Sequence, residues 1–312
     1  MAVAERRAVR ILAGIAVVAV LAVGVRRAAP RALARFFRVR RTGLEITPSD
    51  LALQAEDVTI AGPNDRTLKG WFVACPGDDR PRPAVLVIHG WNGAASLMLP
   101  VASLVQAAGA HALFLDARGH GRSGDDRFSS MPRFADDIDA GLCWLRGDAR
   151  VESNCLVLLG HSVGAGASLL AASRDPRIAG VVSISAMAHP GALMRSNMRA
   201  RGMPSPLITA ILREIERTIG LPLDTFAPIT TIARVRVPVL LVHGGRDEVV
   251  PPADATLLAE ASAGRARLLV VPEADHASLE AFLLAAPAVT SFIQEAAAAA
   301  PTTPPVPGDP RG

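Results

Sequence analysis

The sequence of 312 residues contains no tyrosine, a single lysine (Lys69) and only three cysteines. The cysteines, Cys75, Cys143 and Cys155, are widely spaced and form no CxxC pair, so the pattern excludes a disulfide framework and a cysteine-rich metal site. We expect them to be buried small residues in a reducing compartment. No internal repeat of solenoid length occurs, which excludes a repeat architecture.

Charge is distributed unevenly along the chain. The net charge is +4, but residues 1–41 contain ten arginines and one acid, Glu5, which leaves −5 for residues 42–312. A mildly acidic main domain argues against nucleic acid as a partner. The positive charge belongs to the N-terminal segment, where it indicates a membrane surface instead.

Residues 11–25, ILAGIAVVAVLAVGV, contain no polar side chain. As a helix they would be about 22 Å long, somewhat short for a hydrocarbon core of about 30 Å. A start at Ala8 would lengthen the span if Arg10 snorkels to the interface. We predict a retained membrane anchor, and a cleaved signal peptide is the alternative because an arginine-rich start and a short apolar region also fit one.

More arginines follow this apolar segment than precede it, with seven between residues 26 and 41 against three before residue 11. Positively charged flanks stay on the cytoplasmic side of a membrane. The main domain is therefore predicted to be membrane-anchored and cytoplasmic. A secreted form after signal cleavage is the alternative localisation.

Short β-rich runs recur along the main domain, and helix-like runs separate most of the later ones. The strands are expected at residues 57–61, 68–74, 83–90, 110–118, 154–160, 178–185, 237–245 and 267–274. Apolar strands separated by helices predict a mostly parallel eight-stranded α/β sheet with helices on both faces. The first two strands, joined without a helix, predict an antiparallel hairpin at the edge.

One interval, residues 187–236, contains no convincing strand, although LITAILREIERTIG at 207–220 has helical periodicity. We predict a small helical cap inserted above the carboxyl edge of the sheet, with a packing excursion as the alternative. The expected organisation is a basic segment (1–41), a main domain (42–296) and a disordered proline-rich tail (297–312).

The pentapeptide GHSVG at 160–164 lies between an apolar run and a run of small residues. A strand that ends at Gly160 and a helix that begins near Val163 require a sharp turn, and the glycines remove side chains that would clash there. The turn exposes the Ser162 hydroxyl at a helix N-terminus, where the helix dipole favours negative charge. Ser162 is thus a candidate nucleophile, and a small residue in a tight turn is the alternative.

A serine nucleophile needs a base, and the base needs a carboxylate that orients it. His276 follows the last predicted strand, and we interpret the other six histidines as structural. Asp247, in HGGRDEVVP, follows the preceding strand at the same edge, with Glu248 as its rival. The expected catalytic residues are Ser162, Asp247 and His276.

The developing oxyanion of acyl transfer needs backbone N–H donors. Val163, at the start of the helix after the nucleophile, can supply one. The loop HGWNG at 89–93 can supply the other, for which we predict the amide of Trp91, although its side chain could also form a hydrophobic wall. No metal or organic cofactor is expected.

Five motifs together resemble a serine hydrolase of the α/β-hydrolase fold, of the esterase, lipase and serine aminopeptidase-like group. They are HGWNG at 89–93, DARGHGRSG at 116–124, GHSVG at 160–164, HGGRDEVVP at 243–251 and DH at 275–276, and the resemblance covers residues 57 to about 296. It implies a triad of Ser162, Asp247 and His276. It also implies that the DARGHGRSG segment is structural.

This resemblance predicts a serine-dependent acyl hydrolase that cleaves an ester or thioester through an acyl-enzyme. Serine at the elbow excludes epoxide hydrolases and haloalkane dehalogenases, which use aspartate there, and dienelactone hydrolases, which use cysteine. The expected substrate is a small-molecule or lipid-derived acyl compound. An acyltransferase on the same triad and a membrane-tethered binding module without catalysis are the alternatives.

Overall fold

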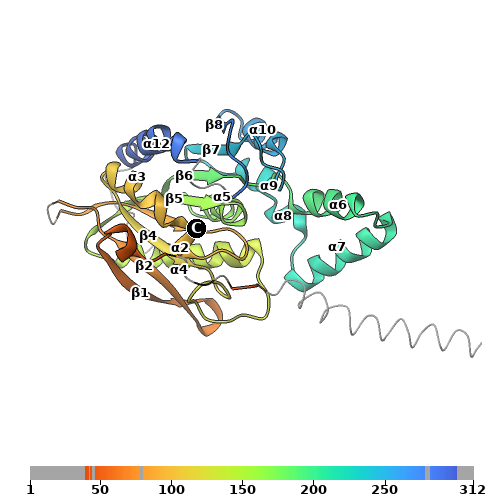
Figure 1. The fold of residues 1–312 in the computed structure, drawn as a ribbon, viewed down its shortest axis with the longest axis horizontal. Helices are drawn as coiled ribbons and strands as arrows, with labels where there is room; N and C mark the ends of the chain where they lie inside the picture. The colour runs from red at the N-terminus through yellow and green to blue at the C-terminus, as the bar shows by residue number, and fades with distance from the viewer. Residues whose placement is uncertain (1–38, 42, 44–45, 78–79, 278–281, 301–312) are drawn as a thin grey trace, which may run out of the picture.

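The computed structural model describes residues 39–41, 43, 46–77, 80–277 and 282–300 (Figure 1). Within these residues, eight strands form one sheet in the order β1-β2-β4-β3-β5-β6-β7-β8. The strands are β1 (Ala55–Gly62), β2 (Arg66–Val73), β3 (Arg82–Ile88), β4 (His111–Asp116), β5 (Val151–His161), β6 (Ile178–Ile184), β7 (Val239–Gly244) and β8 (Ala266–Val271). β1 pairs antiparallel with β2, β2 pairs antiparallel with β4, and the other pairs are parallel. The predicted mostly parallel sheet with an edge hairpin is confirmed.

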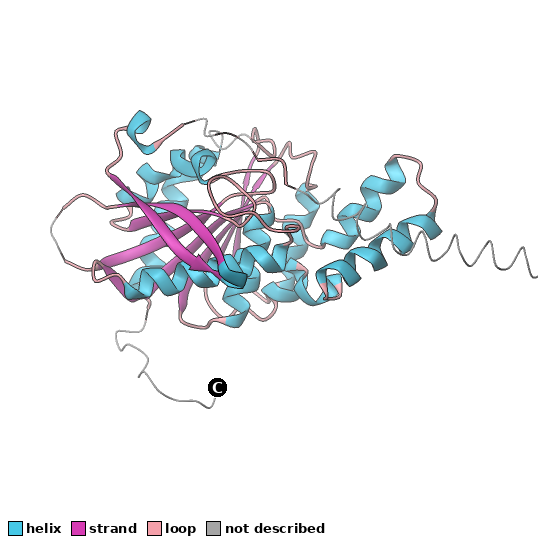
Figure 2. Cartoon of the chain, turned by 90° about the horizontal axis from the view of Figure 1, so that it is seen from below, coloured by secondary structure: helices cyan, strands magenta, loops and turns pink. Residues whose placement is uncertain are grey.

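Helices cover both faces of the sheet (Figures 1 and 2). They are α2 (Ala95–Met98), α3 (Ala102–Ala107), α4 (Met131–Gly147), α5 (Val163–Arg174), α6 (Pro190–Ala200), α7 (Ser205–Ile219), α8 (Leu223–Phe226), α9 (Pro228–Ile232), α10 (Pro252–Ala261) and α12 (Ala286–Ala298). In strand β3, successive side chains point alternately to the two faces of the sheet. Its Leu86 and Ile88 join the core cluster that contains residues of α4 and α5, whereas Val85 and Val87 join the cluster of α2, α3 and α12. Both faces of a central strand are therefore buried, which explains its unbroken apolar run.

Helices α6 to α9 lie between β6 and β7, in the interval predicted to be a cap. Figure 1 shows α6 and α7 projecting from the body of the molecule beyond one end of the sheet. α7 buries Ile208, Leu212 and Ile215, which lie on one side of the helix because they are four and three residues apart. α7 therefore corresponds to the helix predicted at 207–220.

The N-terminal prediction needs correction. Residues 11–25 lie outside the described residues, and no helix in the described part of the chain is long and apolar enough to cross a bilayer. The longest described helix, α4, has 17 residues and includes charged side chains, because helices that cover a sheet are apolar on one side only. We withdraw the predicted membrane-anchored, cytoplasmic localisation and the membrane as a partner.

Two smaller differences concern the tail and the cysteines. α12 continues to Ala298, past the predicted start of the tail at residue 297, and residues 301–312 lie outside the described part of the chain. Cys155 is buried as expected, but Cys143 is exposed and Cys75 is half-buried. The expectation of three buried cysteines was therefore wrong for Cys143, which lies on a surface helix.

Candidate active site

Three parallel strands end at the same edge of the sheet, and each is followed by one of the predicted catalytic residues. Ser162 follows β5, Asp247 follows β7 and His276 follows β8. Because neighbouring parallel strands end on the same side, their loops meet above the carboxyl edge. The topology thus brings residues separated by up to 114 positions into one site.

The three side chains form a hydrogen-bonded series. His276 Nε2 lies 3.0 Å from Ser162 Oγ, and His276 Nδ1 lies 2.7 Å from Asp247 Oδ2. A carboxylate can only accept, so Nδ1–H donates to Asp247 and leaves Nε2 free to accept the serine proton. The Asp247 side chain is fully buried, whereas His276 remains 16% exposed. The arrangement can transfer a proton from a serine hydroxyl to an imidazole.

The turn at Ser162 is strained in the way that its flanking glycines suggest. Ser162 has φ 54° and ψ −117°, a conformation that non-glycine residues rarely adopt. A Cβ at Gly160 would lie 2.4 Å from the Gly164 carbonyl oxygen, and a Cβ at Gly164 would lie 2.4 Å from the His89 carbonyl oxygen. Only glycine fits either position, and the hydroxyl is thereby held at the start of α5.

Both carboxylate oxygens of Asp247 accept hydrogen bonds. Oδ1 accepts hydrogen bonds from the backbone N–H groups of Val249 at 3.0 Å and Val250 at 2.8 Å. Burial alone would raise the pKa of Asp247, but hydrogen bonds from His276 and Val250 outweigh it and lower the pKa from its usual value. The carboxylate therefore stays ionised opposite the histidine. The rival Glu248 is exposed at the surface.

One supporting residue was not expected from the sequence. His161 Nε2 donates a hydrogen bond of 2.8 Å to the backbone carbonyl of His276, and the two rings lie 5.1 Å apart. Burial lowers the pKa of His161 to about 4, so at neutral pH this imidazole is neutral and adds no charge beside His276. Its position next to the serine in GHSVG was the only signal in the sequence.

The loop HGWNG approaches the nucleophile closely. A Cβ at Gly90 would lie 3.1 Å from the Ser162 Cβ, which is closer than an ordinary van der Waals contact. Trp91 follows Gly90 in the same loop, and Val163 is the first residue of α5. The first N–H groups of a helix have no acceptor within the helix. Both predicted oxyanion donors thus come from backbone beside Ser162.

The DARGHGRSG segment was interpreted as structural, and its Asp116, Arg118 and His120 are buried. Asp116 accepts a hydrogen bond of 2.7 Å from the backbone N–H of Ala95, after the HGWNG loop. Arg118 forms a buried ion pair of 2.8 Å with Asp137 of α4. His120 is fully buried, and its ring lies 6.1 Å from that of Trp91. The segment supports the loop that carries Trp91.

Arg41 also contacts the DARGHGRSG segment. Its guanidinium donates hydrogen bonds to the backbone carbonyls of His120 at 3.3 Å and Ser123 at 2.7 Å. It also pairs with the Asp125 carboxylate at 2.7 Å. The Arg41 side chain therefore connects the start of the described chain to a loop about eighty residues later in the sequence.

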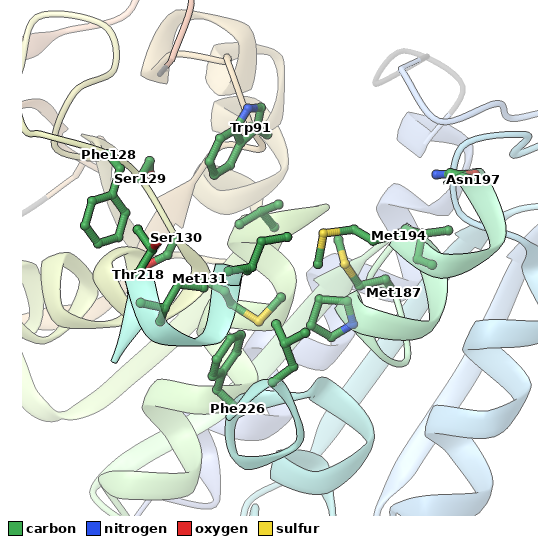
Figure 3. Close-up of a pocket in the computed structure, with 16 residues that line it drawn as sticks. Trp91, Phe128, Ser129, Ser130, Met131, Met187, Met194, Asn197, Thr218 and Phe226 are labelled. Carbon is green, nitrogen blue, oxygen red and sulfur yellow. The ribbon is translucent and has the colours of Figure 1, made fainter. Parts of the chain in front are cut away.

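A cavity of about 210 Å³ is lined by Val163, the residue after Ser162, and lies between the body of the domain and the cap (Figure 3). Trp91 and Val163 line it on the side of the site, and residues of α6, α7 and α8 line it on the side of the cap. Among the described residues, no cluster of histidine, cysteine or acidic side chains could hold a metal ion.

Comparison with known proteins gives matches in sequence and in fold. A sequence-family model described as serine aminopeptidase, S33, matches residues 79–219. An uncharacterized protein of Mycobacterium tuberculosis is 28% identical over 269 residues, which cover 86% of this chain and 88% of that protein. The uncharacterized protein YfhR of Salmonella typhimurium is 28% identical over 79% of this chain and 84% of its own length.

Solved structures extend the comparison to the whole fold. The esterase Pf2001 of Pyrococcus furiosus matches with a TM-score of 0.64 at 20% identity, over 83% of this chain and 96% of the esterase. Est1E of Butyrivibrio proteoclasticus matches with a TM-score of 0.63 at 18% identity, over 78% and 99% of the two chains. These matches give no support to an acyltransferase or to a binding module without catalysis.

Proposed function

We propose that the chain, which has the α/β-hydrolase fold, is a serine hydrolase that cleaves carboxylic esters through an acyl-enzyme. The observation that carries the proposal is the hydrogen-bonded series from Ser162 Oγ through His276 to the buried carboxylate of Asp247. The esterases among its structural relatives support a small-molecule ester as substrate.

In the first half of the reaction, Ser162 Oγ attacks the ester carbonyl while His276 Nε2 takes the hydroxyl proton. Asp247 stabilises the imidazolium that forms. The backbone N–H groups of Trp91 and Val163 stabilise the oxyanion, and such donors are each worth about 10²- to 10³-fold in rate. The tetrahedral intermediate then loses its alcohol, which takes the proton from His276, and Ser162 remains acylated.

In the second half, water replaces the alcohol. His276 takes a proton from water, the hydroxide attacks the acyl carbon, and the bond to Ser162 breaks. The proton returns to Ser162 Oγ through His276. The products are a carboxylic acid and free enzyme, and each step balances without a metal or redox partner.

The proposal is tested by labelling the purified protein with a fluorophosphonate, which phosphonylates activated serines. We expect the label on Ser162, located by mass spectrometry, and its loss in Ser162→Ala. A matched control is Ser173→Ala, because this serine lies on α5 and its hydroxyl donates to the Leu170 carbonyl at 2.7 Å. A folded wild-type protein that takes up no label, or that is labelled equally in Ser162→Ala, would contradict the proposal.

A further inference from the structure

The cavity beside the serine lies toward the oxyanion donors. Of its described lining residues, Trp91 and Val163 belong to the loops that carry the proposed donors, and none belongs to residues 272–277, which carry His276. Figure 3 shows Trp91 on one side of the space, with Met187, Met194 and Phe226 around the rest. The described lining thus includes neighbours of the proposed oxyanion donors and no residue of 272–277.

The position of the histidine decides which half of an ester enters this cavity. The alcohol must leave next to His276 Nε2, because that atom returns the proton to it. The acyl half stays bonded to Ser162 and extends away from the histidine. A cavity bounded by Trp91 and Val163 but by no described residue of the histidine loop therefore lies where the acyl half goes.

The lining also restricts the chemistry of that group. No described residue that lines the cavity carries a charge, and most of the lining is apolar. A charged group that leaves water needs an ionic partner, and the polar residues of this lining, Ser129, Ser130, Asn197 and Thr218, are all neutral. The charged end of a peptide, such as the ammonium group on which an aminopeptidase acts, therefore does not fit. Methionines at 131, 187 and 194 add side chains that adapt to different aliphatic shapes.

We propose that this cavity binds the acyl half of the substrate and selects uncharged, mainly aliphatic acyl groups of limited length. The inference rests on the proposed function and adds the substrate class. Each methylene buried in the cavity should raise kcat/KM about fourfold until the cavity is full. Groups longer than the cavity gain nothing further.

A pair of isomeric esters separates the acyl half from the alcohol half. Ethyl octanoate and octyl acetate have the same composition, but the long chain is on the acyl side of the first and on the alcohol side of the second. We expect kcat/KM for ethyl octanoate to exceed that for octyl acetate about tenfold or more. The reverse preference, or equal rates, would overturn the proposal.

Two leucine-to-tryptophan variants test the location. Leu193 of α6 lines the cavity, whereas Leu207 of α7 is 50% exposed and is not among the lining residues. In Leu193→Trp the larger side chain fills part of the cavity, so we expect the preference for ethyl octanoate to fall about tenfold or more. Leu207→Trp should keep the wild-type ratio. If both variants behave alike, the cavity does not select the acyl chain.

The combined results of labelling and hydrolysis distinguish this inference from the proposed function. Hydrolysis of leucine p-nitroanilide in preference to the esters would show that a charged substrate is accepted and would overturn the inference, although Ser162 would still be labelled. Absence of both labelling and hydrolysis would instead overturn the proposed function, and the inference with it. Labelling together with a preference for octyl acetate overturns the inference alone.

Discussion

The Asp247 carboxylate divides its oxygens between two partners. Oδ2 accepts from His276 at 2.7 Å, and Oδ1 accepts from the backbone of Val249 and Val250. The backbone bonds fix the orientation of the carboxylate, so the histidine is held in the tautomer that leaves Nε2 as an acceptor. A single residue thereby connects the loop after β7 to the hydrogen bond between His276 and Ser162.

This geometry predicts the effect of a single amide substitution. Asp247→Asn keeps the shape but can present an N–H to His276, which favours the wrong tautomer, and we expect kcat to fall about 10⁴-fold. Glu248→Gln is the matched control because Glu248 is exposed, and it should stay near wild type. The measurement is kcat for steady-state hydrolysis of one ester by the wild type, Asp247→Asn and Glu248→Gln. A larger loss in Glu248→Gln would show that the neighbouring carboxylate has the role.

Single residues also show how far the sequence could predict the site. Ser162, Asp247 and His276 could be named because each follows a strand end in a recognisable motif. The hydrogen bond from His161 to the His276 carbonyl could not, because it depends on the path of the loop after β8. Neither could the residues that line the cavity, since these depend on where the cap lies.

At the scale of elements, the turn from β5 to α5 depends on two close backbone approaches. In Gly164→Ala the new methyl group would lie 2.4 Å from the His89 carbonyl oxygen. We expect a loss of about 1–3 kcal/mol in the free energy of unfolding, together with a lower kcat because Ser162 moves with the turn. Thermal unfolding and ester hydrolysis measure the two effects.

The control for this variant lies at the end of α4. A Cβ at Gly147 meets no atom within 4 Å, and alanine favours a helix over glycine. Gly147→Ala should therefore keep or slightly raise the melting temperature and leave kcat unchanged. Equal destabilisation by both substitutions would mean that close packing at the turn is not the cause.

The elements differ in how well the sequence predicted them. All eight strands were expected because each is a short run rich in β-forming residues, and α7 was expected from its periodicity. β5 begins at Val151 rather than at residue 154, where its pairing with β3 changes register. α8 and α9 have only four and five residues. Such helices are too short for a periodic signal, so their boundaries depend on tertiary packing.

At the scale of the whole molecule, buried histidines make stability depend on pH. Burial lowers the pKa of His89 to about 4, of His120 to about 3 and of His161 to about 4. In the unfolded chain each would titrate near pH 6.5. Below that pH the unfolded state binds protons that the folded state does not, so stability present above pH 6.5 is lost as pH falls toward 4.

We expect the free energy of unfolding to fall by about 2 kcal/mol for each of these histidines between pH 7.5 and pH 5. Urea unfolding at the two pH values measures the change. In His89→Gln, which removes one of the three groups, the change over this range should be less destabilising by about 2 kcal/mol, although the variant is less stable at both pH values. Burial raises the pKa of Asp137 to about 7 and of Asp139 to about 6, which acts in the opposite direction in both proteins. An equal change in the wild type and in His89→Gln would therefore contradict the expectation.

The contacts of Arg41 also bear on where this domain can be joined to other sequences. Its guanidinium bridges oxygens of His120, Ser123 and Asp125, so it belongs physically to the main domain although the sequence suggested a boundary after it. A tag or fusion partner attached at residue 42 would replace this arginine and release the support under Trp91. A junction ahead of residue 39 would keep it, and a linker there would leave the DARGHGRSG segment with its native neighbour.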